Sequence, residues 1–231
     1  MLNNLHQQAL QSAMSEQPSL SLNFYSFGVT LSKQEDGKQT EYPVDPAQIA
    51  VALSAKITFS TGLLSENTLY VHQSGLTKTI VEYRPPQMTG VFLDDSDIPL
   101  RIPFPPLVMI RRTRDDLATY NVYAVKKRPQ SLDAPLFNPP LPNVFDSGSV
   151  CWGSVAMVSD EALADTVLTE DWGRLLGTPF GNHAVSRKSK VYPDDIRQQW
   201  VALETNRKRR YPISDLLPLH RTLEQALGGS G

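Results

Sequence analysis

The sequence predicts an α+β fold in which an antiparallel sheet is followed by a mainly helical half. Short runs rich in β-branched and aromatic residues succeed one another between residues 68 and 127, with brief polar links between them. Apolar residues at helical spacing return only after residue 153. Hydrophobic residues make up 40% of the chain and charged residues 20%, which is enough to bury a core. Strands and helices are therefore expected to be segregated along the chain.

The first part of the chain, residues 1–44, is expected to be an extension that ends in a β-hairpin. Residues 19–33 are expected to form one strand, and Asp36-Gly37 is a turn signal before a second strand, "QTEYPV". A short helix should then open the main domain, residues 45–227. Asp45 is its expected N-cap, and Pro46 stands at the first helical position.

The main domain is expected to contain an antiparallel meander, a long irregular loop and several helices. The expected strands cover residues 68–73, 78–84, 89–95, 106–113 and 119–127. Five prolines between residues 128 and 153 exclude regular helix and interior strand, and a long ordered loop in a compact domain is often functional. The expected helices are one capped by Ser159, one capped by Thr169, one over 193–210 with Ile196, Trp200 and Leu203 on one face, and one over 214–227 interrupted at Pro218.

Charge and composition exclude several classes of protein. The formal net charge of −2 argues against nucleic acid as the main partner. The N-terminus has neither the basic start nor the apolar core of a secretory signal, and there is no apolar run of the roughly 18 residues that a membrane span needs. A single cysteine forms no internal disulfide, so we expect a cytoplasmic protein. Residues 228–231, Gly-Gly-Ser-Gly, are interpreted as an added linker.

The only cysteine, Cys151, lies at the end of the proline-rich loop. One interpretation is a small buried hydrophobe, and the other is a nucleophile displayed between the two halves of the domain. No histidine, lysine or arginine is near it in the sequence, and His183 is the nearest histidine. A nucleophilic Cys151 would thus suit exchange between thioesters, because the incoming acyl group is already activated.

Asn143 is a candidate partner of this cysteine. An asparagine amide can donate hydrogen bonds to the oxyanion that develops in acyl transfer. Gly148 permits a turn between the two residues, so Asn143 could fold back beside Cys151.

The stretch "LPNVFDSGSVCWGS" (141–154) resembles the active-site segment of ubiquitin-conjugating enzymes. That segment reads His-Pro-Asn, a hydrophobic residue, turn residues, Gly, any residue, a hydrophobic residue and Cys. The residues in register are Pro142, Asn143, Val144, Gly148, Val150 and Cys151. The tract "APLFNPPLPNVFDSGSVCWG" and the later "LLGTPFGNH" resemble the prokaryotic family D of these enzymes, including protein B of ParB-related, ThiF-related (PRTRC) cassettes. The resemblance implies an α+β fold of the ubiquitin-conjugating type, extended by the N-terminal hairpin.

The resemblance also implies a function and a set of partners. Cys151 would accept the C-terminal glycine of a ubiquitin-like modifier as a thioester, and Asn143 would stabilise the oxyanion when an amine attacks. The partners would be a ThiF-like activating enzyme, a small ubiquitin-like protein and often a JAB-type peptidase, and no metal or other cofactor is expected. Leu141 replaces the family histidine, and no residue is matched to the acidic group that helps to deprotonate the amine. Its candidates by position are Asp160, Glu161 and Asp165.

The alternative is a non-catalytic binding or scaffold module of the same cassette.

Three further features of the sequence each have two interpretations. His183 is either an exposed loop residue or an aid to proton transfer, and Trp152 either shields a thioester or anchors the loop. The run Arg207-Lys208-Arg209-Arg210 is either a solvated helix end or a contact for an acidic partner or nucleic acid.

Overall fold

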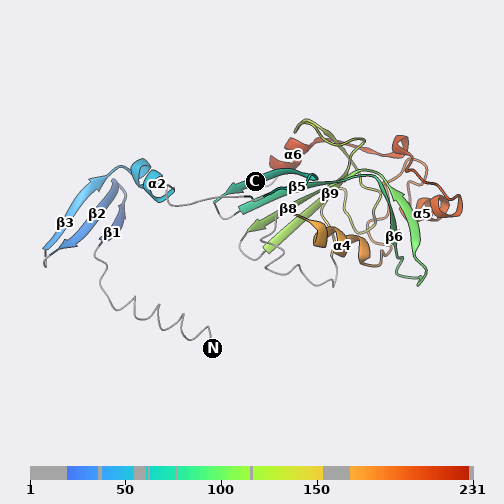
Figure 1. Ribbon diagram of the computed structural model, residues 1–231, viewed down its shortest axis with the longest axis horizontal. Coiled ribbons are helices and arrows are strands. Elements are labelled where there is room, and N and C mark those ends of the chain that lie inside the picture. The colour runs from blue at the N-terminus through green and yellow to red at the C-terminus, as the bar shows by residue number, and fades with distance from the viewer. Residues whose placement is uncertain are drawn as a thin grey trace, which may run out of the picture. The chain divides into compact units, whose positions relative to one another are not determined.

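The computed structural model divides into two compact units, Met1–Ser60 and Thr61–Gly231 (Figure 1). The residues it describes are 20–35, 38–54, 61, 63–75, 77–114, 117–152 and 167–228.

The first unit holds a three-stranded antiparallel sheet and a helix. Its elements are β1 (Leu20–Tyr25), β2 (Gly28–Glu35), β3 (Lys38–Val44) and α2 (Pro46–Ser54), with β2 in the middle of the sheet. The single strand expected over 19–33 is wrong, because a turn at Ser26 and Phe27 divides it into two. The helix start agrees with the sequence, since Asp45 Oδ1 accepts a hydrogen bond of 2.9 Å from the Ala47 amide. Asp36 and Gly37 lie outside the described residues.

The second unit is organised around a six-stranded antiparallel sheet in the order β11-β10-β9-β8-β5-β4. These strands are β4 (Thr68–Ser74), β5 (Thr77–Arg84), β8 (Leu107–Arg114), β9 (Leu117–Ala124), β10 (Pro135–Phe137) and β11 (Pro218–Thr222). The antiparallel pairing was predicted, but the strands do not form a simple meander. Between β5 and β8 the chain forms a separate hairpin of β6 (Gln87–Val91) and β7 (Leu100–Phe104). Consequently β5 pairs directly with β8 along its whole length.

Strand β7 was not among the expected strands. The expectation that residues 128–153 hold no interior strand is wrong, because β10 lies between β9 and β11 in the sheet. The sequence did not reveal β10 and β11. Both begin with a proline, a position in which the missing amide removes little from the ladder. The helix expected over 214–227 is therefore wrong in part. A short 3-10 helix (Ile213–Asp215) precedes β11, and only α6 (Leu223–Gly228) is helical after it. Helix α6 includes Gly228, the first residue of the expected linker.

Two longer helices follow the cysteine loop. Helix α4 (Thr169–Gly177) begins after Leu168, so Thr169 is its first residue and not its cap. Helix α5 (Ile196–Thr205) is capped by Asp195 and buries Ile196, Trp200 and Leu203, as predicted. It ends before the basic run, not with it. The helix expected after Ser159 lies outside the described residues.

Side chains on both faces of the six-stranded sheet are buried. On one face, Ile80, Met109 and Val122 pack with Trp172 and Leu175 of α4 and Trp200 of α5. On the other face, Val81, Ile110 and Tyr123 pack with Leu223 and Ala226 of α6. Burial on both sides explains why β8 is a nearly continuous apolar run where it begins, "LVMI". The loop that precedes and includes Cys151, here called the cysteine loop (residues 141–151), packs on the first face. Its Leu141 and Val144 are part of that core.

Candidate active-site loop

The segment from Asn143 to Cys151 is a closed, hairpin-like loop. The Cys151 amide donates to the Asn143 carbonyl at 2.7 Å, and Val144 and Val150 form an antiparallel bridge next to this contact. Inside the loop, the Phe145 amide donates to Ser149 O at 2.9 Å and the Gly148 amide donates to Phe145 O at 2.8 Å. The fold thus brings Asn143 and Cys151 together through their backbones.

The loop is also hydrogen-bonded to strand β9. The Val122 amide donates to Gly148 O at 2.8 Å, and the Val150 amide donates to Tyr120 O at 3.2 Å. Gly148 has φ +87°, and a Cβ at this position would overlap the ring of Tyr123. The Tyr123 hydroxyl in turn donates to Ser147 O at 2.8 Å. Only glycine meets both the backbone and the packing requirement at position 148.

Asn143 itself adopts a left-handed backbone, with φ 60°. Asparagine tolerates this region better than most residues, which is a local reason for its presence here. Its backbone amide donates a hydrogen bond to the carbonyl of His183 at 2.8 Å. Among the described residues, its half-buried side chain has no hydrogen-bond partner, so the side-chain amide is not engaged within the loop.

The residues before Asn143 are held by the core. Leu141 is completely buried, and the indole of Trp200 donates to Pro140 O at 3.0 Å. The side chain in the place of the family histidine is therefore a packing residue. Asn138, also buried, donates from Nδ2 to Arg187 O at 2.8 Å and so joins the start of the loop to the segment after α4.

Lys188 stabilises the loop by a side-chain hydrogen bond, and nothing in the sequence pointed to this role. This lysine is completely buried, and its Nζ donates to the carbonyl of Val144 at 2.6 Å. Burial of the ammonium lowers the pKa of Lys188 to about 8, against the opposing effect of Asp146. Its neighbour Arg187 forms an exposed salt bridge with Asp146 of the loop.

Trp152, next to the cysteine, is anchored on the sheet. Its ring meets that of Tyr120 edge-on, with 5.0 Å between centroids. The Tyr120 hydroxyl donates to Asp171 Oδ1 at 2.8 Å, and Asp171 Oδ2 pairs with Arg111 Nη1 at 2.9 Å. Burial and the neighbouring Asp171 raise the pKa of Tyr120 well above its ordinary range. The geometry favours the reading of Trp152 as an anchor.

Cys151 is a free, half-buried thiol, so the interpretation as a fully buried hydrophobe is not supported. His183 is exposed, and its ring lies edge-on to Phe145 of the loop at 5.5 Å. Asp160, Glu161 and Asp165 lie outside the described residues. In the part of the chain that the structure describes, no group of three potential metal ligands occurs.

Residues 47–219 match the prokaryotic E2 family D, E2 being the ubiquitin-conjugating class. The chain belongs to prokaryotic E2 family D. No curated protein and no solved structure matches it. For a member of this family, the mixed fold with antiparallel sheets and few helices is the expected type. Within the described residues, no helix has the length and apolarity to span a bilayer.

The family match begins inside helix α2, which belongs to the first compact unit. This helix was expected to open the conjugating domain, with a boundary between residues 44 and 45. That boundary stays a prediction.

Proposed function

We propose that this protein is a conjugating enzyme that carries a ubiquitin-like modifier on Cys151 and transfers it to an amine. The observation that carries the proposal is the 2.7 Å backbone hydrogen bond between Cys151 and Asn143. It joins the only thiol of the chain to an asparagine whose amide is available, in a member of the E2 class. The thioester on Cys151, its transfer to an amine and the partners named below are all part of the proposal.

The chemistry consists of two acyl transfers. The Cys151 thiolate attacks the carbonyl carbon of the modifier's C-terminal glycine, which arrives as a thioester on an activating enzyme. The new C–S bond forms, the old C–S bond breaks, and the released thiolate takes up the proton that Cys151 lost. In the second step an amine attacks the same carbon, the Cys151 thiolate leaves, and the proton lost by the amine passes to solvent or a base.

Asn143 acts in the second step. The amine's attack places negative charge on the carbonyl oxygen, and a preorganised amide donor stabilises that charge. The loop preorganises Asn143 through two backbone hydrogen bonds, one to His183 and one from Cys151. These bonds fix the main chain while the side chain stays available for the oxyanion.

Transfer to Cys151 is tested with a ThiF-like activating enzyme, ATP and a ubiquitin-like protein. A reductant-sensitive adduct should form on the wild-type chain, Cys151→Ser should give a reductant-resistant ester or no adduct, and Cys151→Ala should give none. With partners shown to be active on another conjugating enzyme, an adduct at a different residue or no adduct at all contradicts the proposal.

The role of Asn143 is tested with Asn143→Asp, which keeps the shape and the tolerance of a left-handed backbone but removes the amide donor. The variant should load the modifier normally and then release it to a free amine about 100-fold more slowly, as expected for loss of an oxyanion donor. Asn67→Asp, the same change in a turn before β4, is the matched control. Equal discharge rates in the two variants would remove Asn143 from the mechanism.

The alternative of a scaffold rested on Leu141 in place of the family histidine and on the lack of a residue matched to the deprotonating acidic group. The complete burial of Leu141 gives that replacement a packing reason, so it no longer favours a non-catalytic module. The proposed partners are a ThiF-like activating enzyme, a small ubiquitin-like protein and a JAB-type peptidase, as in the PRTRC cassettes. A scaffold would keep its biological activity in the Cys151→Ala variant, whereas the conjugating enzyme would lose it.

A further inference from the structure

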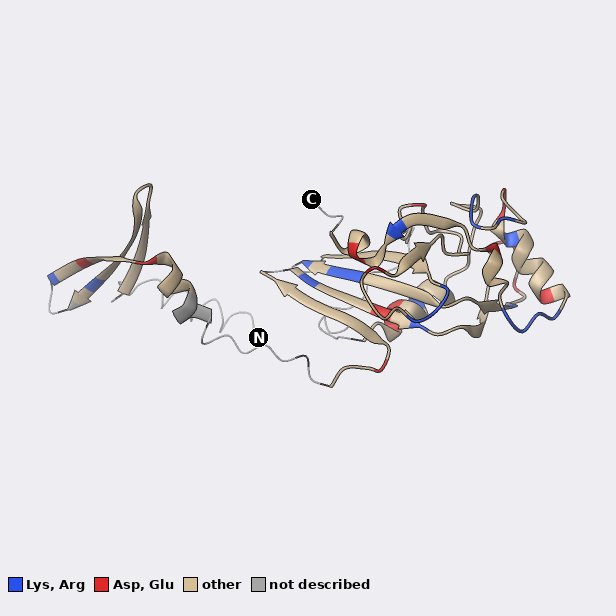
Figure 2. Cartoon of the chain, turned by 90° about the horizontal axis from the view of Figure 1, so that it is seen from above, with Lys and Arg blue, Asp and Glu red and all other residues tan. Residues whose placement is uncertain are grey.

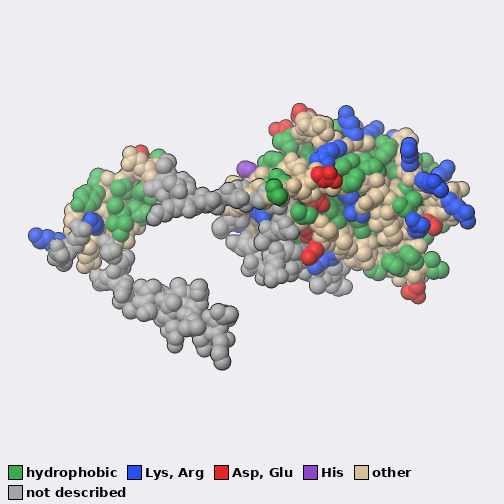
Figure 3. Space-filling view, viewed as in Figure 1, with side chains coloured by type: hydrophobic (Ala, Val, Ile, Leu, Met, Phe, Trp, Pro, Cys, Tyr) green, Lys and Arg blue, Asp and Glu red, His purple; other side chains and the backbone are tan. Residues whose placement is uncertain are grey.

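A cationic surface lies after helix α5 and takes no part in the proposed chemistry. It consists of Arg101, Lys126 and the run Arg207-Lys208-Arg209-Arg210, all of them exposed. Figure 2 shows the run as a blue stretch beyond α5, and Figure 3 shows Lys and Arg side chains gathered at that end of the second unit. The whole chain has a formal charge of −2, so this is a local concentration of positive charge.

The run is held in place by its backbone. After α5 ends at Thr205, the Arg207 amide donates to Glu204 O and the Lys208 amide donates to Leu203 O, both at 2.9 Å. Arg207 has φ 50°, the left-handed conformation typical of a helix C-terminus. The first two cations of the run, Arg207 and Lys208, therefore project from a hydrogen-bonded turn.

Acidic side chains of the described residues do not neutralise this surface. Among the described residues, ion pairs join Arg111 to Asp171, Arg187 to Asp146 and Arg197 to Asp195. None of them includes a member of the cationic surface. Glu204 is the one acidic residue of the adjoining hollow, and its carboxylate accepts a 2.9 Å hydrogen bond from the Arg101 amide. The positive charge is thus available to a partner.

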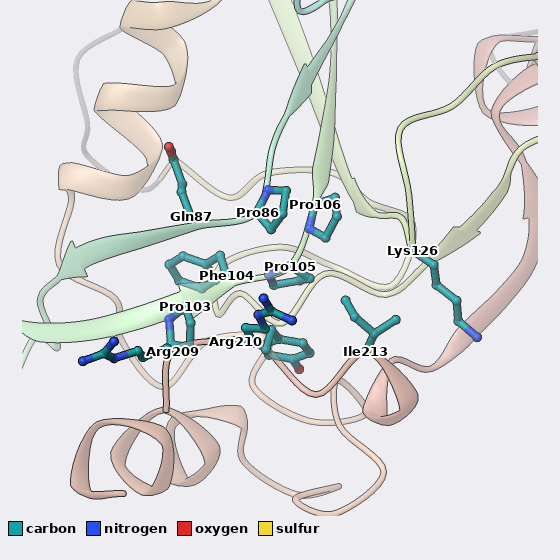
Figure 4. Close-up of a pocket in the computed structure, with 11 residues that line it drawn as sticks. Pro86, Gln87, Pro103, Phe104, Pro105, Pro106, Lys126, Arg209, Arg210 and Ile213 are labelled. Carbon is teal, nitrogen blue, oxygen red and sulfur yellow. The ribbon is translucent and has the colours of Figure 1, made fainter. Parts of the chain in front are cut away.

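An apolar pocket of about 480 Å³ opens among these cations. Its wall is the proline-rich end of β7 and the following residues, Pro103 to Pro106, with Pro86 beside them. Figure 4 shows Arg209 and Lys126 at opposite ends of the pocket, with Arg210 between them. Arg209 also lines a second hollow of about 620 Å³, so the two recesses adjoin.

We infer that this surface binds an acidic peptide segment of a partner, with an apolar side chain in the proline-lined pocket and carboxylates on the surrounding cations. Several separate cations along two adjoining recesses fit an extended chain with several carboxylates better than a single small anion. Single-stranded RNA is less favoured, because it needs exposed aromatic faces for its bases. The aromatic residues here, Phe104 and Tyr211, are only 2% and 6% exposed.

The test uses the full chain and a short fluorescein-labelled peptide of glutamates around one phenylalanine, followed by fluorescence anisotropy. The peptide should bind more tightly at low salt, and replacing its glutamates by glutamine or its phenylalanine by serine should weaken binding. The double variant Arg209→Glu/Arg210→Glu should weaken it about tenfold or more, because two attractions become repulsions.

The matched control is Lys38→Glu/Arg114→Glu, which changes the net charge equally. Lys38 lies in the first unit, and Arg114 ends β8 at the opposite end of that strand from the pocket. Thermal unfolding checks that both variants fold. Equal loss of binding in the two variants, or no binding of the peptide to the wild-type chain, overturns the inference. Binding of a labelled oligouridylate RNA without binding of the peptide overturns it in favour of nucleic acid. None of these outcomes depends on Cys151, so they are distinct from failure of the proposed conjugation.

Discussion

At the residue scale, the shape of the cysteine loop depends on residues that are not nucleophiles. Gly148 gives the loop room against Tyr123, and Asn143 provides a left-handed turn without the cost that a β-branched residue would have there. Lys188 binds the carbonyl that follows Asn143. The position of the Cys151 thiol is therefore a property of the whole loop.

Replacement of Gly148 by alanine should destabilise the protein by about 1–3 kcal/mol, because the added Cβ meets the Tyr123 ring and the left-handed backbone becomes strained. The same change at Gly173, exposed in helix α4 with open space around it, should stabilise by about 0.5–1 kcal/mol. Urea unfolding at neutral pH measures both values. Equal effects of the two substitutions would show that the Tyr123 contact does not restrict position 148.

Lys188 should make stability depend on pH in the alkaline range. Its pKa is about 8 in the folded protein and an ordinary 10.5 after unfolding, so between these values the unfolded chain binds the extra proton. Stability of the wild-type chain should therefore rise with pH across this window, by at most about 3 kcal/mol relative to Lys188→Met. Unfolding free energies of both chains at pH 7.5, 9 and 10.5 measure the difference. A difference that does not change with pH would contradict the lowered pKa.

The residues of the site were predictable only where spacing along the chain carries the signal. Asn143, Gly148 and Cys151 lie close in sequence, so a turn could be expected to join them. Lys188 could not be found in this way, because "SRKSK" has the composition of an ordinary solvated loop and its burial arises from distant packing. Tyr123 was identified as a strand residue, but its contact with Gly148 depends on register, which composition does not specify.

At the element scale, helix α4 is joined to the sheet by a buried polar network beneath Trp152. Asp171, in the first turn of α4, accepts a hydrogen bond from the Tyr120 hydroxyl and forms a salt bridge with Arg111. The side chains of Arg111 and Asp171 are essentially inaccessible to solvent. The patterns correctly predicted strands β4, β5, β8 and β9 and the helices at Thr169 and Ile196. The short strands that begin with Pro135 and Pro218 were not, because their pairing is determined by the neighbouring strand rather than by their own residues.

This network should respond asymmetrically to substitution. Arg111→Met leaves Asp171 as an uncompensated buried charge and should cost about 3–5 kcal/mol, whereas the double variant Arg111→Met/Asp171→Leu should cost much less. Tyr120→Phe keeps the ring against Trp152 and removes one hydrogen bond, for about 1–1.5 kcal/mol. Denaturant unfolding of the cycle measures the coupling. Additive losses from Arg111→Met and Asp171→Leu would show that the pair is not coupled.

At the scale of the whole molecule, the sequence indicated strands before helices, and the cysteine loop does lie between strand β10 and helix α4. The segregation is incomplete, because strand β11 of the main sheet follows helix α5. Among the residues that the structure describes, the two core clusters of that unit draw on residues from Leu69 onward. Sequence pattern alone did not reveal that the β6–β7 hairpin leaves the main sheet or that β11 returns to it beside β10. These are long-range pairings, and they depend on the packing of the complete chain.

A chain that begins at residue 45 should therefore fold and keep a reactive Cys151. It retains α2, where the family match begins, and every described residue of the two core clusters. Its main thermal transition should lie within about 3 °C of that of the full chain, since a shift of a few degrees corresponds to about 1 kcal/mol in a domain of this size. The rate of Cys151 modification by a thiol reagent should be unchanged.

A chain that ends at Leu217 is the contrasting variant. It loses β11 and α6, so the apolar surface that Leu223 and Ala226 cover becomes exposed, and cooperative unfolding should disappear. If the chain from residue 45 unfolds without a cooperative transition, the first 44 residues are part of the folding unit and the predicted boundary is wrong.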